Sequence, residues 1–201
     1  MKKAIYLLFF ISIYSFGQDN STNSLKDTNK NSGFFNITKV SFSAITGLKQ
    51  ERFIEGVGNI FSDLDAAGAH AWSVQTINGY FVSCYFSLGL GVGIDGYNRP
   101  NFKTLPLFLD LRGYFSDAED STYFYLDIGP NLSFGGADSD FKKGIAFNFG
   151  VGYKFKVGNR LFLVSDIFYS HKTVSLTNEG IGTSDDIIKV NGVGLSLGFI
   201  F

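Results

Sequence analysis

Two short patterns in the sequence resemble motifs that react with or bind ligands. Gly194-Leu-Ser-Leu-Gly198 matches the Gly-x-Ser-x-Gly pattern of a serine nucleophile, which requires the serine to lie on a sharp turn between a strand and a helix. Gly89-Leu-Gly-Val-Gly93 resembles a phosphate-binding loop, which requires a helix directly after it. Apolar residues alternate with small ones through both stretches, which indicates strands instead. We therefore predict no catalytic residue here, and we expect the glycines to make room for aromatic side chains of neighbouring strands.

The remaining reactive residue types are few and scattered. The chain has two histidines, His70 and His171, and one cysteine, Cys84. Ser170 precedes His171, but neighbouring residues of a strand point to opposite faces. A single cysteine cannot form an internal disulfide, and no Cys/His cluster has the spacing of a zinc site. The sequence therefore predicts no metal site and no bound cofactor.

A set of polar residues alternates with apolar residues along the predicted strands, and these polar residues would share one face. Its members are Lys39, Asp110, Arg112, Tyr125, Asp127, Lys154 and Asp166. A turn near Ala118 would fold Asp110 and Arg112 back onto the next strand, beside Tyr125 and Asp127. Three cations and three carboxylates balance, and buried charges must be paired and hydrogen-bonded. We expect a buried network; the alternative is two carboxylates that share a proton for acid–base chemistry.

Strands must position these residues, and the stretch Val193–Phe201 shows the pattern most clearly. Its odd-numbered residues are large and apolar, and its even-numbered residues are small except Ile200. This alternation is typical of a strand with one apolar face. The chain also contains 24 glycines and 23 phenylalanines, which suits an all-β protein with crowded interior positions.

Eight stretches of this kind predict an eight-stranded antiparallel up-and-down β-barrel that spans a membrane. They lie near Phe35–Gly47, Gly68–Asn78, Ser83–Tyr97, Thr104–Phe115, Ser121–Phe134, Lys143–Lys156, Arg160–Lys172 and Val193–Phe201. Longer connections are predicted after the first, fifth and seventh strands, with a medium one at Asn98–Lys103. Short turns are predicted at the opposite end, which is the loop asymmetry of bacterial outer-membrane barrels. Aromatic residues near the strand ends are expected to form two interfacial girdles. They are Tyr80, Phe81, Phe115, Phe199 and Phe201 at one end and Tyr97, Phe102, Phe134, Phe141 and Tyr169 at the other.

The segments before the predicted barrel have a different composition. Residues 1–17 contain Lys2 and Lys3 directly after the first methionine and continue with an apolar run, which predicts a secretory signal peptide. Residues 18–33 are mostly polar and predict a flexible lead-in, so the barrel is expected over residues 34–201. The net charge is −1, which excludes a basic surface for nucleic acid.

Together these features resemble the small outer-membrane β-barrel proteins of Gram-negative bacteria, of the OmpA/OmpX type. In that family a terminal strand ending in phenylalanine is similar to the signal that the barrel-assembly machinery binds, which implies this role for Phe199 and Phe201. The resemblance implies a cell outer-membrane location, contact with membrane lipid and lipopolysaccharide, and both termini in the periplasm. The family includes adhesins, structural anchors and a few lipid-modifying enzymes.

The predicted function is therefore structural or interaction-mediating, with a lumen filled by side chains and with extracellular loops as the binding surface. In the loop after the first strand, Phe53, Val57 and Phe61 are candidate contacts for an extracellular or envelope protein. Their spacing suits a short amphipathic helix, whereas Gly56 and Gly58 favour an extended hairpin. Two alternatives remain, an outer-membrane lipid A hydrolase or acyltransferase and a narrow solute channel.

Overall fold

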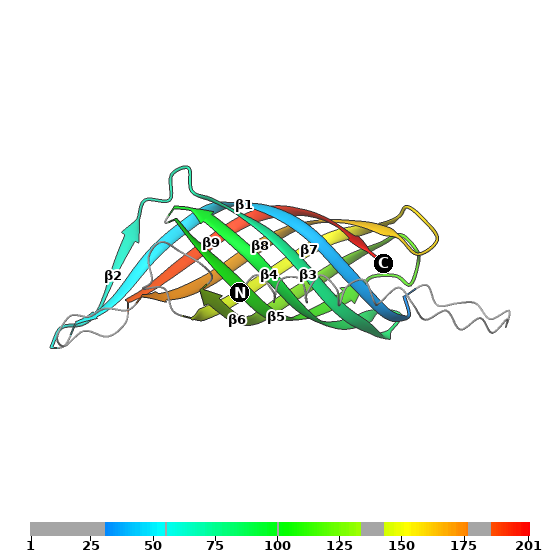
Figure 1. The fold of residues 1–201 in the computed structure, drawn as a ribbon, viewed down its shortest axis with the longest axis horizontal. Helices are drawn as coiled ribbons and strands as arrows, with labels where there is room; N and C mark the ends of the chain where they lie inside the picture. The colour runs from blue at the N-terminus through cyan, green and yellow to red at the C-terminus, as the bar shows by residue number, and fades with distance from the viewer. Residues whose placement is uncertain (1–30, 55, 100, 134–142, 177–185) are drawn as a thin grey trace, which may run out of the picture.

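The computed structural model describes residues 31–54, 56–99, 101–133, 143–176 and 186–201. Most of these residues lie in strands (Figure 1). The strands are β1 (Gly33–Ile54), β2 (Gly58–Leu64), β3 (His70–Ser83), β4 (Phe86–Asn98), β5 (Asn101–Tyr114), β6 (Ser121–Ser133), β7 (Gly144–Lys156), β8 (Phe162–Leu176) and β9 (Asp186–Ile200). Among the described residues no helix is long and apolar enough to cross a membrane.

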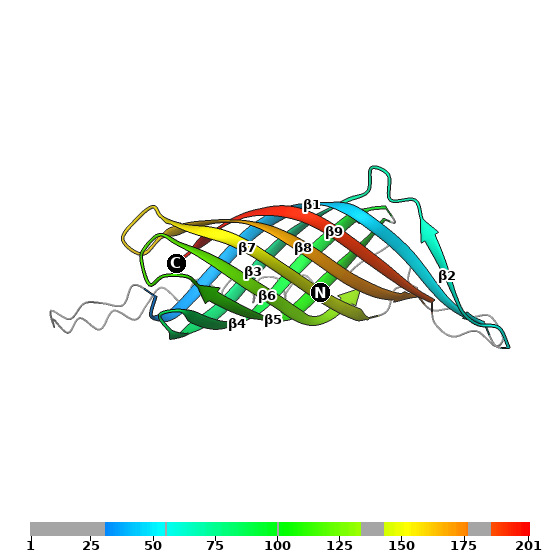
Figure 2. The ribbon, with the colours of Figure 1, turned by 180° about the vertical axis from the view of Figure 1, so that it is seen from behind.

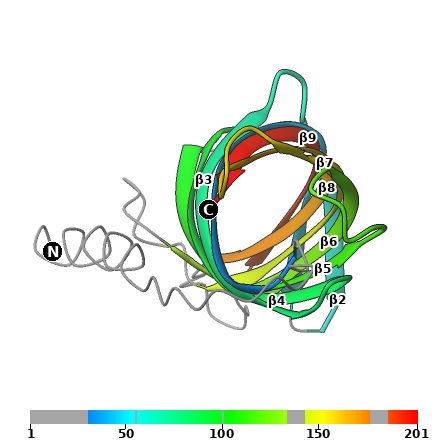
Figure 3. The same cartoon turned by 90° about the vertical axis from the view of Figure 1, so that its right-hand side faces the viewer.

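The sheet closes on itself through its first and last strands. β1 pairs antiparallel with β3 along one edge and with β9 along the other, where Val40 lies opposite Leu197 and Phe42 opposite Leu195. β2 pairs only with β1, so the nine strands comprise an eight-stranded closed barrel and one added strand. The view along the axis shows the resulting ring (Figure 3). The predicted all-β antiparallel barrel, closed by the terminal strand, is confirmed.

Side chains alternate between the lumen and the outer surface along each strand. In β9, Leu195 is 62% exposed whereas Ser196 is 4% exposed, so the serine of the Gly-x-Ser-x-Gly pattern points into the lumen from a regular strand. The outer surface is apolar on all eight barrel strands. Examples, one per strand, are Val40, Val74, Leu90, Leu109, Ile128, Val151, Ile167 and Leu195.

Several inward-facing glycines lie directly under aromatic rings from the neighbouring strand. A Cβ atom at Gly91 would lie 2.3 Å from the Phe108 ring, and one at Gly150 would lie 2.5 Å from the Tyr125 ring. Each glycine is the cross-strand partner of the aromatic residue that covers it. The expectation that these glycines make room for aromatic side chains is confirmed.

The connection after the first strand is a hairpin, so the extended-hairpin alternative is confirmed and the amphipathic helix is wrong. Leu48–Ile54 of β1 pairs with Gly58–Leu64 of β2 and extends beyond the ring of strands (Figures 1 and 2). Gly56 and Gly58 have positive φ angles of 82° and 96°, a conformation that glycine adopts without strain. The hairpin end of the barrel is here called the upper end, and the end with the Cys84–Tyr85 turn the lower end.

Other strand boundaries also differ from the predictions: β3 continues through the predicted turn Gly79–Val82, and β8 continues to Leu176, beyond the predicted end at Lys172. The medium connection expected at Asn98–Lys103 is shorter than predicted, because Asn98 pairs with Asn101. β9 begins at Asp186, well before Val193, because it pairs with the extended part of β1. The signal peptide predicted for residues 1–17, most of the lead-in and the connection Gly135–Phe141 lie outside the described residues.

Candidate functional site

The lumen is filled by two clusters of buried side chains, one toward each end of the barrel. The lower cluster contains Phe35, Ile37, Ile77, Phe108, Tyr114, Tyr123, Tyr125, Val164, Phe168 and Ile200. The upper cluster contains Ile45, Leu48, Ala69, Ala71, Tyr97, Phe102, Val174, Ile188 and Val190. An eight-stranded barrel has an interior just wide enough for such side chains.

Arg112 is the centre of the lower part of the lumen. Its side chain has no exposed surface, and its Nε donates hydrogen bonds to both carboxylate oxygens of Asp110, at 2.8 and 3.0 Å. The guanidinium carbon also lies 5.2 Å from the Tyr123 ring centre and 5.0 Å from that of Tyr125. A cation at this distance from an aromatic face is attracted by the ring, so Arg112 is held by one carboxylate and two rings.

The two other predicted carboxylates, Asp166 and Asp127, have different partners. Asp166 accepts hydrogen bonds from the hydroxyls of Tyr123 and Tyr125, each at 2.9 Å. Asp127 lies opposite Asp110 across β5 and β6, and its Oδ2 is 3.9 Å from Lys39 Nζ. The Lys39 ammonium is also 4.0 Å from the Tyr125 ring centre. Lys39, Asp110, Arg112, Tyr125, Asp127 and Asp166 are thus one connected, buried group.

Lys154 is buried but belongs to a separate contact at the lower end. Its ammonium donates to Asn31 Oδ1 and faces the rings of Tyr114 and Phe162. The Asn31 amide in turn donates to the Cys84 carbonyl at 2.9 Å. The structure therefore places Asn31, from the predicted lead-in, inside the lower mouth of the barrel.

The upper part of the lumen contains an ion pair and an aromatic stack that the sequence analysis did not identify. Lys172 donates to Asp95, which also accepts from the Thr104 hydroxyl at 3.3 Å. Tyr97 and Phe102 stack with their ring centres 4.2 Å apart. They are 6% and 2% exposed, so their predicted place in an outer aromatic girdle is wrong. The signal that would have identified them is strand parity, continued to Tyr97 at the end of the predicted strand Ser83–Tyr97 and to Phe102, two residues before the predicted strand Thr104–Phe115.

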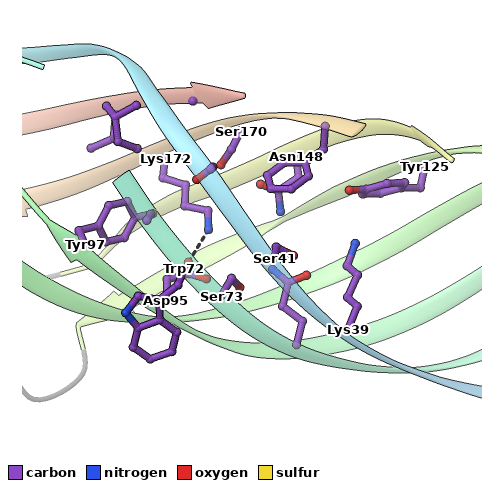
Figure 4. Close-up of a pocket in the computed structure, with 17 residues that line it drawn as sticks. Lys39, Ser41, Trp72, Ser73, Asp95, Tyr97, Tyr125, Asn148, Ser170 and Lys172 are labelled. Carbon is purple, nitrogen blue, oxygen red and sulfur yellow. Dashed lines mark hydrogen bonds and ion pairs between the residues drawn. The ribbon is translucent and has the colours of Figure 1, made fainter. Parts of the chain in front are cut away.

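A pocket lies between the two clusters (Figure 4). Its volume is about 20 Å³, which is room for one or two water molecules. Tyr97 of the upper cluster and Tyr125 of the lower cluster both line it, with polar side chains from several strands between them. These polar residues are Lys39, Ser41, Ser43, Ser73, Gln75, Asp95, Asn148, Ser170 and Lys172.

The other candidate residues lie outside the lumen. His70 Nδ1 is 3.3 Å from the Gly68 carbonyl, and His171 Nδ1 is 2.6 Å from Asn191 Oδ1. Among the described residues no group of three or more His, Cys, Asp or Glu side chains could hold a metal ion. Phe199 is exposed on the outer surface, and the backbone of Phe201 pairs with Asn36.

The candidate contact residues Phe53, Val57 and Phe61 are all exposed on the hairpin of β1 and β2. Glu51 lies opposite Phe61 across the two strands and forms an ion pair with Lys189 of β9, with 2.7 Å between their polar atoms. The Lys189 ammonium also lies 5.9 Å from the Phe61 ring centre. Phe61 is thus held beside an ion pair that joins the hairpin to the barrel.

Comparisons with known proteins agree with this architecture. No family model matches the chain, and no curated protein sequence matches it. The outer membrane protein OprG from Pseudomonas aeruginosa is similar in structure, with a TM-score of 0.55 at 12% identity over 85% of this chain and 95% of OprG. The outer membrane protein AlkL, solved by solid-state NMR in DMPC lipid bilayers, has a TM-score of 0.51 at 22% identity over 91% of this chain and 96% of AlkL. The chain therefore has the closed eight-stranded barrel fold of the small outer-membrane β-barrel proteins.

Proposed function

We propose that the protein spans the outer membrane of a Gram-negative bacterium. The observation that carries this proposal is the apolar outer surface, which continues around the whole barrel. Phe42, Leu90 and Leu197, for example, are 57%, 71% and 49% exposed on three different strands. Apolar patches of this extent in contact with water would cause aggregation, whereas lipid offers these side chains a matching solvent. The closed backbone satisfies its own hydrogen bonds, as a membrane-spanning chain requires.

Two features support a structural or interaction-mediating role within the membrane. The lower part of the lumen is filled by Arg112, Tyr123 and Tyr125, which are at most 1% exposed. Side chains packed in this way oppose the passage of solutes. The hairpin of β1 and β2 extends beyond the ring of strands and exposes Phe53, Val57 and Phe61, which suits contact with an extracellular or envelope protein.

The same proposal sets the orientation of the barrel. The long hairpin faces the outside and contacts lipopolysaccharide, and the short turns and both chain ends face the periplasm, as in bacterial outer-membrane barrels. Residues 1–17 act as the signal peptide for export. Phe199 and Phe201 at the end of the closing strand provide the contact for the barrel-assembly machinery.

Membrane fractionation and gel migration test the location. The full chain should fractionate with the outer membrane, and the unheated folded protein should migrate differently from the heated protein on a denaturing gel. A cysteine introduced in place of Asn59 on the hairpin should react in intact cells with a thiol reagent that cannot cross the membrane. Native Cys84, at the opposite end, should react only after the cells are lysed. Recovery of the chain in the periplasmic fraction would contradict the proposal.

Planar-bilayer recording tests the role. We expect purified protein to give conductance at background level, because the lower lumen is filled. A deletion strain should keep its permeability to small solutes and its lipid A mass profile, and should change in adhesion or in envelope contacts. Stable channels well above background would show a solute channel instead, and a changed lipid A profile would show a lipid-modifying enzyme.

A further inference from the structure

The pocket in the middle of the lumen is lined mainly by polar side chains, and residues of the two clusters close it at either end. Ile45, Ala71, Tyr97 and Val190 of the upper cluster form one wall, and Tyr125 and Phe168 of the lower cluster form the other. Hydroxyl and amide groups form the sides between these walls. The lumen is thus divided along its axis into an apolar layer, a polar layer and a mixed aromatic and charged layer.

Among the described residues, buried atoms without hydrogen-bond partners occur along the lumen, including both terminal nitrogens of Arg112. Three of them belong to side chains that line the pocket, namely Ser73 Oγ, Asp95 Oδ1 and Asn148 Oδ1. Asp95 is 1% exposed and Asn148 is 4% exposed. Leaving a buried polar atom without a partner is costly, so three such atoms around one pocket indicate that a hydrogen-bonding molecule occupies it.

The chemistry of the lining defines the class of that molecule. The carboxylate and amide oxygens accept hydrogen bonds, so the occupant must donate. The charges at the pocket are compensated nearby, because Lys172 is paired with Asp95 and Lys39 lies near Asp127. An ion would therefore gain little to offset its desolvation. The volume of about 20 Å³ limits the occupant to the size of one or two water molecules.

We propose that this pocket is an occluded binding site for water and for neutral hydrogen-bonding molecules of similar size. The Tyr97–Phe102 stack with its upper-cluster neighbours closes the site toward the hairpin end, and Tyr125 and Phe168 close it toward the lower end. The site does not depend on the membrane in which the barrel resides. It makes the lumen a sequence of two barriers with a hydrated compartment between them.

Thiol accessibility in detergent micelles tests the barriers. Ser73→Cys in a Cys84→Ser background places one thiol in the compartment, and methyl methanethiosulfonate is a small neutral probe of its access. We expect this thiol to react at least tenfold more slowly than native Cys84 does in the wild-type protein. Adding Tyr97→Ala and Phe102→Ala should raise the rate at least tenfold, because the upper wall is removed.

The matched control is Cys84 itself, which is partly exposed at the lower turn. Its rate should be unchanged when Tyr97→Ala and Phe102→Ala are introduced into the protein that retains it. If the alanine variants fail to fold, Tyr97→Leu with Phe102→Leu should still raise the compartment rate severalfold. A rate equal to that of Cys84 in the intact barrel, or no change on truncation in a folded variant, would overturn the two barriers.

Water contacts test the occupant independently. In NMR spectra that transfer magnetisation from water, the amide protons of Ser73 and Asn148 should show cross-peaks with water. Those of Ile37 and Ile77, in the lower cluster and without exposed surface, should show none. Equal signals at all four positions would contradict a separate hydrated compartment, and their absence at Ser73 and Asn148 would show a dry cavity.

Discussion

The two filled parts of the lumen are built differently. In the lower part, Arg112, Tyr123, Tyr125 and Asp166 come from three strands and share contacts, so each group has several neighbours that depend on it. In the upper part, the ion pair between Lys172 and Asp95, with Thr104 as a further donor to Asp95, lies beside apolar side chains. Removing one member of the larger network breaks several interactions, whereas removing one member of this smaller group breaks fewer. The lower part should therefore be the more sensitive to substitution.

Removal of the central cation should produce the largest effect. Arg112→Met leaves the Asp110 carboxylate buried without its partner, and breaking a buried ion pair in this way costs about 3–5 kcal/mol. Urea unfolding of the barrel in lipid vesicles measures the free energy of unfolding. The double variant Arg112→Met with Asp110→Leu should recover most of the loss, because the Asp110 carboxylate is then no longer buried without its partner. A loss below about 1 kcal/mol in the single variant would contradict a central role for Arg112.

Removal of the cation in the upper part of the lumen should lower the free energy of unfolding by less. Lys172→Met leaves Asp95 without its cation, but the carboxylate keeps its hydrogen bond from Thr104 and lies beside the hydrated pocket. We expect a loss near the lower limit of the range for broken buried pairs, about 3 kcal/mol, in the same urea experiment. The control Asp95→Asn with Lys172→Met should be more stable than the single variant. A loss greater than that of Arg112→Met would reverse the comparison between the two parts.

The contrast also explains which residues the sequence predicted. Asp110, Arg112 and Asp127 lie in the middle of long alternating strands, so the period of two assigns them to the inward face. The register of one hairpin then places Asp110 opposite Asp127. Lower-lumen residues were predictable because regular strands and a short turn determine both the face and the neighbours of each side chain.

The upper lumen was missed because it depends on where strands end. Asp95 and Tyr97 lie at the end of the expected strand Ser83–Tyr97, and Lys172 ends the expected strand Arg160–Lys172, all with the parity of predicted inward residues. β4 continues through Asp95 and Tyr97 because it pairs there with β3 and β5, and β8 continues past Lys172 because it pairs with the long β9. These partner residues lie elsewhere in the sequence, so the alternation within one strand does not report the pairing. The burial of Asn31 was missed for the same reason, since its partners Cys84 and Lys154 lie far along the chain.

A substitution that crowds the lower network should lower the free energy of unfolding moderately, and a second glycine provides a matched control. In Gly152→Ala the new Cβ atom would lie 2.6 Å from the Tyr123 ring and 2.6 Å from the Ser165 carbonyl oxygen. Overpacking of this kind costs about 1–3 kcal/mol, measured again by urea unfolding. Gly158→Ala is the control, because its nearest neighbour would be Leu161 Cβ at 3.5 Å, an ordinary contact. Equal stability of the two variants would show that Tyr123 moves without cost.

Substitutions at the lower mouth of the barrel should lower the free energy of unfolding less than substitutions in the network above it. Asn31→Ala removes the acceptor for Lys154 and the donor to the Cys84 carbonyl, and loss of a buried partner costs about 1–3 kcal/mol. Water entering from the open end offsets part of this loss, so we expect about 1 kcal/mol. Asn31→Asp is the informative companion, because it keeps an acceptor for the lysine. If Asn31→Asp keeps the wild-type free energy of unfolding while Asn31→Ala lowers it, the contact with Lys154 accounts for the stabilisation.

Breaking the exposed ion pair on the hairpin should have the smallest effect on the free energy of unfolding, below the effects in both buried regions. Lys49 and Asp63 are 3.5 Å apart, but their side chains are 56% and 82% exposed. Water and salt screen such a pair, and exposed pairs contribute about 0–1 kcal/mol. Lys49→Gln should therefore change the free energy of unfolding by less than about 0.5 kcal/mol, and by still less in high salt. The same chemical groups thus have very different effects inside and outside the lumen. A loss comparable to that of Lys172→Met would mean that the hairpin, and not only the lumen, determines the stability of the barrel.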